Sequence, residues 1–229
     1  TSYDTSYKKA LEALHVNNNW LSRARQRWLE KRSEGYNGQF FAIVQGNFYK
    51  DLREQSVEAV IAADTPGIAI GGLSVGEPRE VFGEYLSFTS GLLPEDKPRY
   101  VMGIGTPDYI LAAIENGIDM FDCVLPTRLA RNGQAMTHLG PVSLKKQEYA
   151  FDTLPIDAGC ACEVCKNYSR AYMRHLYKSQ EILFSMLVSY HNLYFLHNLV
   201  KGARQAVEAG CFSKYKHKLL ENYYGETEK

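Results

Sequence analysis

The chain has 229 residues, of which 45% are hydrophobic and 23% are charged, and its 26 basic residues balance its 26 acidic ones. This composition excludes a disordered chain, a collagen-like chain and a uniformly basic nucleic-acid-binding protein, although it allows a local basic patch. No apolar run approaches the roughly 18 residues of a membrane span, and the N-terminal residues lack the features of a signal peptide. We therefore expect no membrane segment and a cytoplasmic location.

A long helix is predicted near the N-terminus. Asp4 is the expected cap, and apolar side chains recur at helical spacing from Tyr7 to Leu29. Gly35 and Gly38 mark the expected end of this helix.

Four short apolar runs follow, and each ends in a polar or loop-forming residue. The runs are nearly continuous rather than alternating, which is typical of strands buried on both faces of a parallel sheet. Pro107 suits the first turn of one of the helices between them. The expected strands are residues 39–45, 67–72, 99–104 and 120–125, and the expected helices are residues 48–63, 77–91 and 106–116. We therefore expect an α/β fold with β-α-β-α-β-α-β order.

The remainder of the chain predicts a second region. Residues 126–160 carry Gly, Pro and Asn and are expected to be irregular, with room for small extra strands, and the chain is expected to be helical again from 160 to about 210. We expect two domains: residues 1–150 with the parallel strands, and residues 151–229 with a metal site and the C-terminal helices.

The number of strands limits the architecture. A closed (β/α)8 barrel needs about 250 residues, so four strands with their helices supply about half of one. Half a barrel leaves open sheet edges. We therefore expect that a preceding segment belongs to the complete protein, or that another polypeptide supplies it.

Three of the five cysteines, Cys160, Cys162 and Cys165, lie within six residues. Without a secretion signal, an odd and clustered set favours a metal site over disulfides. Zinc takes four tetrahedral ligands, and three thiolates with one imidazole form a common structural site that leaves no open position. We expect one structural Zn²⁺. At this point the fourth ligand is open between three histidines of the downstream helical region: His175, His191 and His197.

Asp122 lies near the C-terminal end of the fourth apolar run. A charge buried in a strand is costly, and active sites of parallel barrels form at the C-terminal ends of the strands. Position alone is equally consistent with a catalytic carboxylate and with a hydrogen bond to a loop. Asp119 is the nearest competing carboxylate, but it lies at the entrance of the strand.

Several segments together resemble the tRNA-guanine transglycosylases, also called queuine tRNA-ribosyltransferases. They occur in the family's order and spacing from about residue 36 to the end, and more loosely through the first helix. The matching segments are residues 44–46, 71–77, 100–103, 117–128, 131–135, 189–192 and the three-cysteine element. The resemblance implies the C-terminal half of an irregular (β/α)8 TIM barrel with an inserted zinc-binding subdomain, in which His191 is the fourth zinc ligand.

The resemblance also implies a pentosyltransferase of the queuosine pathway. It would exchange guanine at the tRNA wobble position for 7-aminomethyl-7-deazaguanine through a covalent ribosyl intermediate on Asp122. Gln45, Gly72, Leu73 and Met102, at the ends of the first three expected strands, would bind the 7-deazaguanine base. The family's general base comes from the first half of the barrel, and we find no matching motif here.

Contacts with the tRNA anticodon loop are implied for Arg128 and Arg131, which would read the bases beside the exchanged guanine. The remaining basic residues form two sets that could track phosphates or could be solvated faces. These sets are Lys166, Arg170, Arg174 and Lys178, and Lys201, Arg204, Lys214, Lys216 and Lys218. Family members from bacteria are homodimers with an aromatic cluster near this region, so we expect a homodimer with Tyr168, Tyr172 and His175 on one helix face.

Val75 bears on the choice of base. A β-branched side chain is stiff and fills space, whereas eukaryotic members generally have glycine there to admit the larger queuine. If Val75 faces the substrate rather than the core, the smaller base is favoured.

The alternative to a transglycosylase enzyme is a non-catalytic, zinc-containing tRNA-binding subunit, although such a subunit need not retain Asp122 and Gln45. A generic barrel enzyme acting on another glycoside would leave the cysteine cluster unexplained.

Overall fold

The computed structural model describes residues 1–225, so the last four residues of the expected second domain lie outside the described residues. The chain forms two compact units. The sheet unit comprises Thr1–Ile104 and Ala112–Cys123, and the helical unit comprises Gly105–Leu111 and the chain from Val124 onward. The division expected after residue 150 stays a prediction, because compactness does not show which part folds independently.

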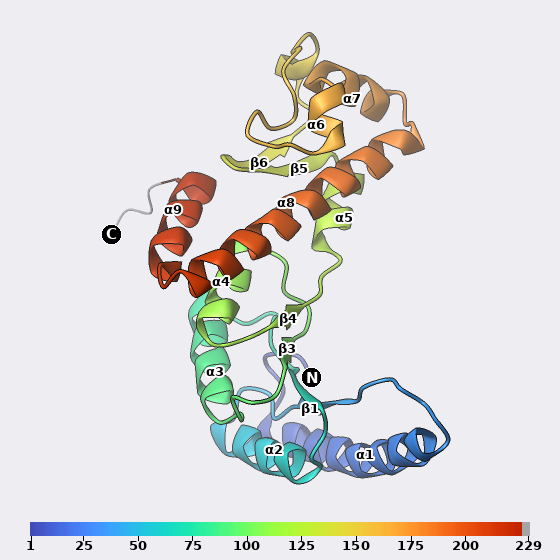
Figure 1. Ribbon diagram of the computed structural model, residues 1–229, viewed down its shortest axis with the longest axis vertical. Coiled ribbons are helices and arrows are strands. Elements are labelled where there is room, and N and C mark those ends of the chain that lie inside the picture. The colour runs from blue at the N-terminus through green and yellow to red at the C-terminus, as the bar shows by residue number, and fades with distance from the viewer. Residues whose placement is uncertain (226–229) are drawn as a thin grey trace. The chain divides into compact units, whose positions relative to one another are not determined.

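A four-stranded parallel sheet lies at the centre of the sheet unit (Figure 1). Its strands follow the order β1 (Phe41–Val44), β2 (Gly67–Ile70), β3 (Arg99–Val101) and β4 (Met120–Phe121). The expected α/β fold with a parallel sheet is confirmed. The fourth strand is shorter than expected, because β3 ends at Val101 and leaves Phe121 as the last paired residue of β4.

Burial differs among the strands. Every residue of β2 is buried, whereas β1 alternates and Met120 in β4 is 46% exposed. The expectation that all four strands are buried on both faces is therefore wrong for the outer two. Among the described residues, β1 and β4 each pair with one strand only, so less of their surface is covered.

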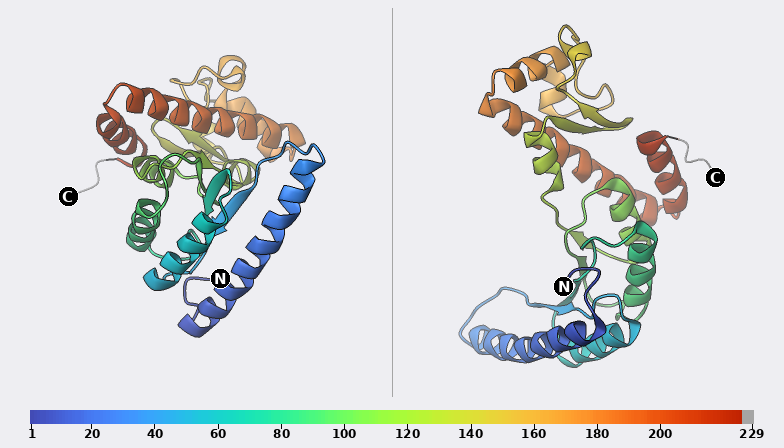
Figure 2. Two further views of the ribbon diagram at one scale, coloured as in Figure 1. Left: turned by 60° about the horizontal axis from the view of Figure 1, so that its bottom comes forward. Right: turned by 180° about the vertical axis from the view of Figure 1, so that it is seen from behind.

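One helix precedes the sheet in the chain, and one follows each of the first three strands. Helix α1 (Tyr7–Ser33) comes before β1, and α2 (Lys50–Ala62), α3 (Arg79–Gly91) and α4 (Pro107–Glu115) follow β1, β2 and β3. The first residues of α4 group with the helical unit. Figure 2 shows α1 lying alongside α2, and Ala10, Leu14 and Leu52 form the apolar contact between them. The expected cap of α1 is wrong: Ser6 precedes the helix, and Asp4 accepts a hydrogen bond from Ser2 instead.

The helical unit is built on one long helix, α8 (Ile182–Glu208). Its other elements are α5 (Leu125–Arg131), β5 (Gln134–Thr137), β6 (Gly140–Ser143), the 3-10 helix η1 (Gln147–Tyr149), α6 (Glu163–Asn167), α7 (Arg170–Lys178) and α9 (Phe212–Tyr224). The β5–β6 hairpin is antiparallel, and β5, α5, α6, α7 and α9 all contact α8 (Figure 1). Leu144, Ile156, Phe184 and Val188 belong to the buried core of this unit.

One expectation for this unit is wrong and another is confirmed. Residues 125–131 form α5 rather than irregular structure, since Pro126 suits the first turn of a helix. The expected helical region from 160 to about 210 is confirmed: it consists of α6, α7 and α8, and α9 follows it beyond residue 210. Within the described part of the chain, no helix is long and apolar enough to cross a membrane.

Candidate functional site

Asp122 follows β4 directly, and its side chain is exposed. Its Oδ1 accepts hydrogen bonds from the Tyr100 hydroxyl, at 2.5 Å, and from the backbone N–H of Gly103, at 3.1 Å. The expected penalty for a buried charge therefore does not apply, because this carboxylate is reached by solvent. Both hydrogen bonds found in the described part of the chain fall on Oδ1, which leaves Oδ2 able to meet a substrate.

The contact with Asp122 changes the pKa of the Tyr100 hydroxyl. The hydrogen bond to Asp122, together with partial burial, raises the pKa of Tyr100 to about 12. A hydrogen bond that favours the neutral form of a donor raises its pKa. The hydroxyl therefore stays protonated at neutral pH and keeps donating to the carboxylate.

Asp119, the competing carboxylate, has a structural role at the other end of β4. Its Oδ2 accepts a hydrogen bond from the Arg99 backbone N–H at 2.8 Å, and its own N–H donates to the Arg99 carbonyl at 2.9 Å. These contacts close the β3–β4 pair where β4 begins. The geometry favours Asp122 as the carboxylate available for chemistry.

Gln45 lies at the end of β1 against two glycines that follow β2. Its backbone N–H donates to Ser56 Oγ at 2.9 Å. A Cβ on Gly71 would lie 2.7 Å from Gln45 Nε2, and a Cβ on Gly72 would lie 3.1 Å from Gln45 Oε1. Gly72 also has a φ of 68°, which disfavours other residues. The glycines therefore let the amide rest directly on the backbone.

The loop after Gly72 is held by a carboxylate. Glu77 accepts hydrogen bonds from the N–H groups of Ser74 and Val75, the latter at 2.8 Å. The Leu73 side chain is buried, whereas Val75 is 38% exposed and Met102, just after β3, is 36% exposed. Val75 thus does not face the core of the sheet unit, and Met102 has a free surface at the same ends of the strands.

Arg53 was missed by the sequence analysis. It lies on α2, its side chain is fully buried, and its guanidinium donates to the backbone carbonyls of Asn47, Gly71 and Gly72. Burial lowers the pKa of Arg53 to about 10, so it remains charged at neutral pH. The sequence did contain a sign of its burial, because Arg53 recurs at helical spacing with Val57 and Val60 on the buried face of α2.

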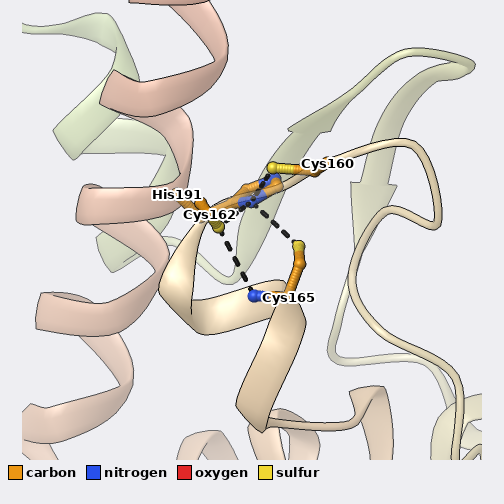
Figure 3. Close-up of side chains that lie close together, drawn as sticks. All are labelled: Cys160, Cys162, Cys165 and His191. Carbon is orange, nitrogen blue, oxygen red and sulfur yellow. Dashed lines mark hydrogen bonds between the residues drawn. The ribbon is translucent and has the colours of Figure 1, made fainter.

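The second candidate site is in the helical unit, where three sulfurs surround one imidazole (Figure 3). His191 Nδ1 lies 3.7, 3.5 and 3.4 Å from the Sγ atoms of Cys160, Cys162 and Cys165. A tetrahedral zinc with ordinary bond lengths would place each sulfur about 3.5 Å from the nitrogen. The residues therefore fit a Zn²⁺ ion. His175 and His197 are exposed and stand outside the cluster.

The imidazole is oriented by a carbonyl. His191 Nε2 lies 2.8 Å from the Met136 carbonyl oxygen, which favours a proton on Nε2 and leaves Nδ1 as the ligand atom. Burial lowers the pKa of His191, which favours the neutral ring that a metal ligand requires. The next residue, Asn192, accepts a hydrogen bond from the Met136 N–H at 2.8 Å. Together, these contacts join α8 to β5 through both backbone polar groups of Met136.

The candidate tRNA-binding residues have different environments. Arg128 and Arg131 are exposed in the last turn of α5. In the first basic set, Arg170 binds Asp152 and the Ile156 carbonyl, Arg174 binds the Lys146 carbonyl, and Lys166 pairs with Glu163. These contacts favour a structural role for most of that set. Tyr168 and Tyr172 stack with ring centroids 5.3 Å apart.

Comparison with known proteins gives a consistent result. A family model described as "Queuine tRNA-ribosyltransferase" matches residues 1–225. The protein of that name from Treponema denticola is 52% identical over 97% of this chain and 59% of its own length. Those from Borrelia hermsii and Caldanaerobacter subterraneus are 47% and 44% identical, over 97% and 99% of this chain and 59% of their own lengths. The chain thus spans about 59% of the length of these curated relatives.

Proposed function

Because the chain belongs to the queuine tRNA-ribosyltransferase family, we propose that it serves in the exchange of a tRNA base. The reaction is a pentosyl transfer in which guanine at the wobble position is replaced by 7-aminomethyl-7-deazaguanine, as a step of queuosine biosynthesis. The observation that carries this proposal is the exposed Asp122 carboxylate, held through one oxygen at the strand ends where Gln45 and Gly72 also meet.

Asp122 is the nucleophile of this proposal. Its Oδ2 attacks C1′ of the ribose, the bond between C1′ and the guanine nitrogen breaks, and guanine leaves with the bonding electrons and takes up a proton. The incoming base then loses a proton and attacks C1′, which breaks the ester bond and restores the carboxylate. Tyr100 and the Gly103 N–H fix the carboxylate for this attack. No described residue is assigned as the general base.

The base is held at the ends of β1, β2 and β3. The Gln45 amide offers both a donor and an acceptor, and the backbone of Gly72 and Leu73 can approach a flat ring closely because glycine has no side chain. Met102 supplies an apolar wall. Val75 is exposed, and we propose that its stiff, β-branched side chain limits the room beside Leu73, which favours the smaller base over queuine.

The tRNA anticodon loop is the macromolecular substrate of the proposal. Arg128 and Arg131 are exposed and available to bases beside the exchanged guanine. The guanine must leave its stack to reach Asp122, as expected for enzymes that act on a base or its glycosidic bond. We further propose a cytoplasmic homodimer in which the stacked Tyr168 and Tyr172 lie near the interface, and a (β/α)8 barrel as the complete architecture.

Zinc has a structural role in this proposal. Cys160, Cys162, Cys165 and His191 would fill all four positions of a tetrahedral ion. When bound, the ion would join the cysteine loop to α8, and it would take no part in the transfer.

The test is guanine exchange. The chain is assayed alone and as a chimaera in which it replaces the matching segment of the Treponema denticola relative, which is 52% identical. We expect the chimaera to incorporate labelled guanine into tRNA, and the intact relative serves as the positive control. If a folded chimaera binds tRNA but incorporates no guanine, the chain is the non-catalytic tRNA-binding subunit instead.

A further inference from the structure

Arg53 connects the two strand ends that form the proposed base site. Its Nε donates to the Asn47 carbonyl at 2.8 Å, just after β1. Its two Nη atoms donate to the Gly71 carbonyl at 3.3 and 3.2 Å, and Nη2 also reaches the Gly72 carbonyl at 3.2 Å. The guanidinium further lies over the Tyr85 ring, 6.0 Å from its centroid. One side chain thus satisfies three carbonyls at the ends of β1 and β2.

These contacts fix the direction of two peptide planes. In a trans peptide the C=O and the N–H of the following residue point in opposite directions. The Gly71 and Gly72 carbonyls point toward Arg53, so the N–H groups of Gly72 and Leu73 must point away from it. Two neighbouring donors that point the same way suit the ring acceptors of a purine-like base.

The C-terminal end of this loop is held by a negatively charged side chain, the Glu77 carboxylate. Glu77 accepts the N–H groups of Ser74 and Val75, while Arg53 binds the carbonyls of Gly71 and Gly72. The backbone from Gly71 to Val75 is therefore held at one end through its carbonyl groups and at the other end through its N–H groups. A flexible glycine pair would otherwise lose these orientations, since Gly72 can adopt many backbone conformations.

We propose that Arg53 is a positioning residue, which aims the Gly72 and Leu73 N–H groups at the acceptor atoms of the bound purine or 7-deazapurine. This inference rests on the proposed function and adds a determinant of base recognition to it. Arg53 donates to the base-binding backbone and not to Asp122. Its loss should therefore weaken use of the base more than use of the tRNA.

The decisive variant is Arg53→Met, which keeps an apolar stem of similar length and removes every donor. In the chimaera we expect the KM for guanine to rise on the order of tenfold, the effect of losing aligned hydrogen bonds. The KM for tRNA should stay within about twofold of the wild-type value. Arg53→Lys, which keeps one charged donor group, should recover part of the guanine KM.

Arg99→Met is the matched control. Arg99 is also buried and also donates to backbone carbonyls, those of Leu93 and Pro94, but it lies where β3 begins. We expect Arg99→Met to lower the thermal unfolding temperature without changing the KM for guanine. This control separates a loss of positioning from a general loss of stability.

The outcomes distinguish the two proposals. If the wild-type chimaera exchanges no guanine, the proposed function fails and the role of Arg53 fails with it. If it is active and Arg53→Met leaves the guanine KM unchanged, only the role of Arg53 is wrong. Should Arg53→Met not fold, Arg53→Lys decides: a guanine KM equal to wild type would overturn the inference, and a selective rise would support it.

Discussion

At the scale of single residues, Asp122 combines exposure with restraint. Two donors hold its Oδ1, while the side chain remains open to solvent. A nucleophile needs both properties, because a correctly oriented group reacts faster than a freely rotating one. The Asp119 carboxylate, by contrast, accepts a hydrogen bond from the backbone N–H of Arg99.

Replacing Asp122 tests this assignment. In the chimaera, Asp122→Asn retains the shape but removes the charge, so the covalent tRNA adduct should disappear from denaturing gels while tRNA binding remains. Asp119→Asn is the control, and it should lower stability but leave the adduct. An adduct that persists in Asp122→Asn would assign the chemistry to another carboxylate.

The contact between Tyr100 and Asp122 also predicts a pH dependence. The pKa of Tyr100 is raised to about 12, above that of about 10 expected in an unfolded chain. The hydrogen bond therefore stabilises the folded chain below about pH 10, and this contribution is lost as the pH rises toward 12. NMR of ¹³C-labelled tyrosine should show late titration of Tyr100, and Asp122→Asn should move its pKa down. Titration near 10 in both proteins would show that the hydrogen bond is absent in solution.

At the scale of elements, α8 carries two adjacent residues with complementary tasks. His191 faces the three sulfurs, and Asn192 binds backbone groups of α5 and β5, including the Pro126 carbonyl at 2.9 Å. The cysteine loop, the hairpin and α5 are therefore all tied to one turn of α8. A metal bound here would stabilise several elements together, because ligand binding and local folding are coupled.

Removing one thiolate should show this coupling. Cys162→Ser is expected to release the metal and to lower the unfolding temperature of the helical unit. Cys211→Ser is the matched control, because Cys211 is an exposed cysteine outside the cluster. Elemental analysis should give about one zinc per chain for the control. An equal zinc content in Cys162→Ser would contradict the assigned ligand set.

At the scale of the whole molecule, sequence patterns predicted the parallel sheet and the cysteine cluster. Both depend on local signals: continuous apolar runs in one case and close spacing of thiols in the other. The exposure of Asp122 was not predictable, because it depends on where β3 ends and β4 loses its partner. The burial of Arg53 could have been predicted from its place on the apolar face of α2, but its role could not, since its carbonyl partners at Gly71 and Gly72 are distant in sequence. The barrel itself stays a proposal.

The contact between Gln45 and Gly71 has a consequence for how this site can change during evolution. A methyl group at position 71 would lie 2.7 Å from the Gln45 amide nitrogen and 2.9 Å from Ile43 Cγ2, so both side chains would have to shift to admit it. An alanine at position 71 would therefore displace the Gln45 amide from its place against the two glycines. Natural variation at position 71 is expected to be accompanied by variation at positions 43 and 45.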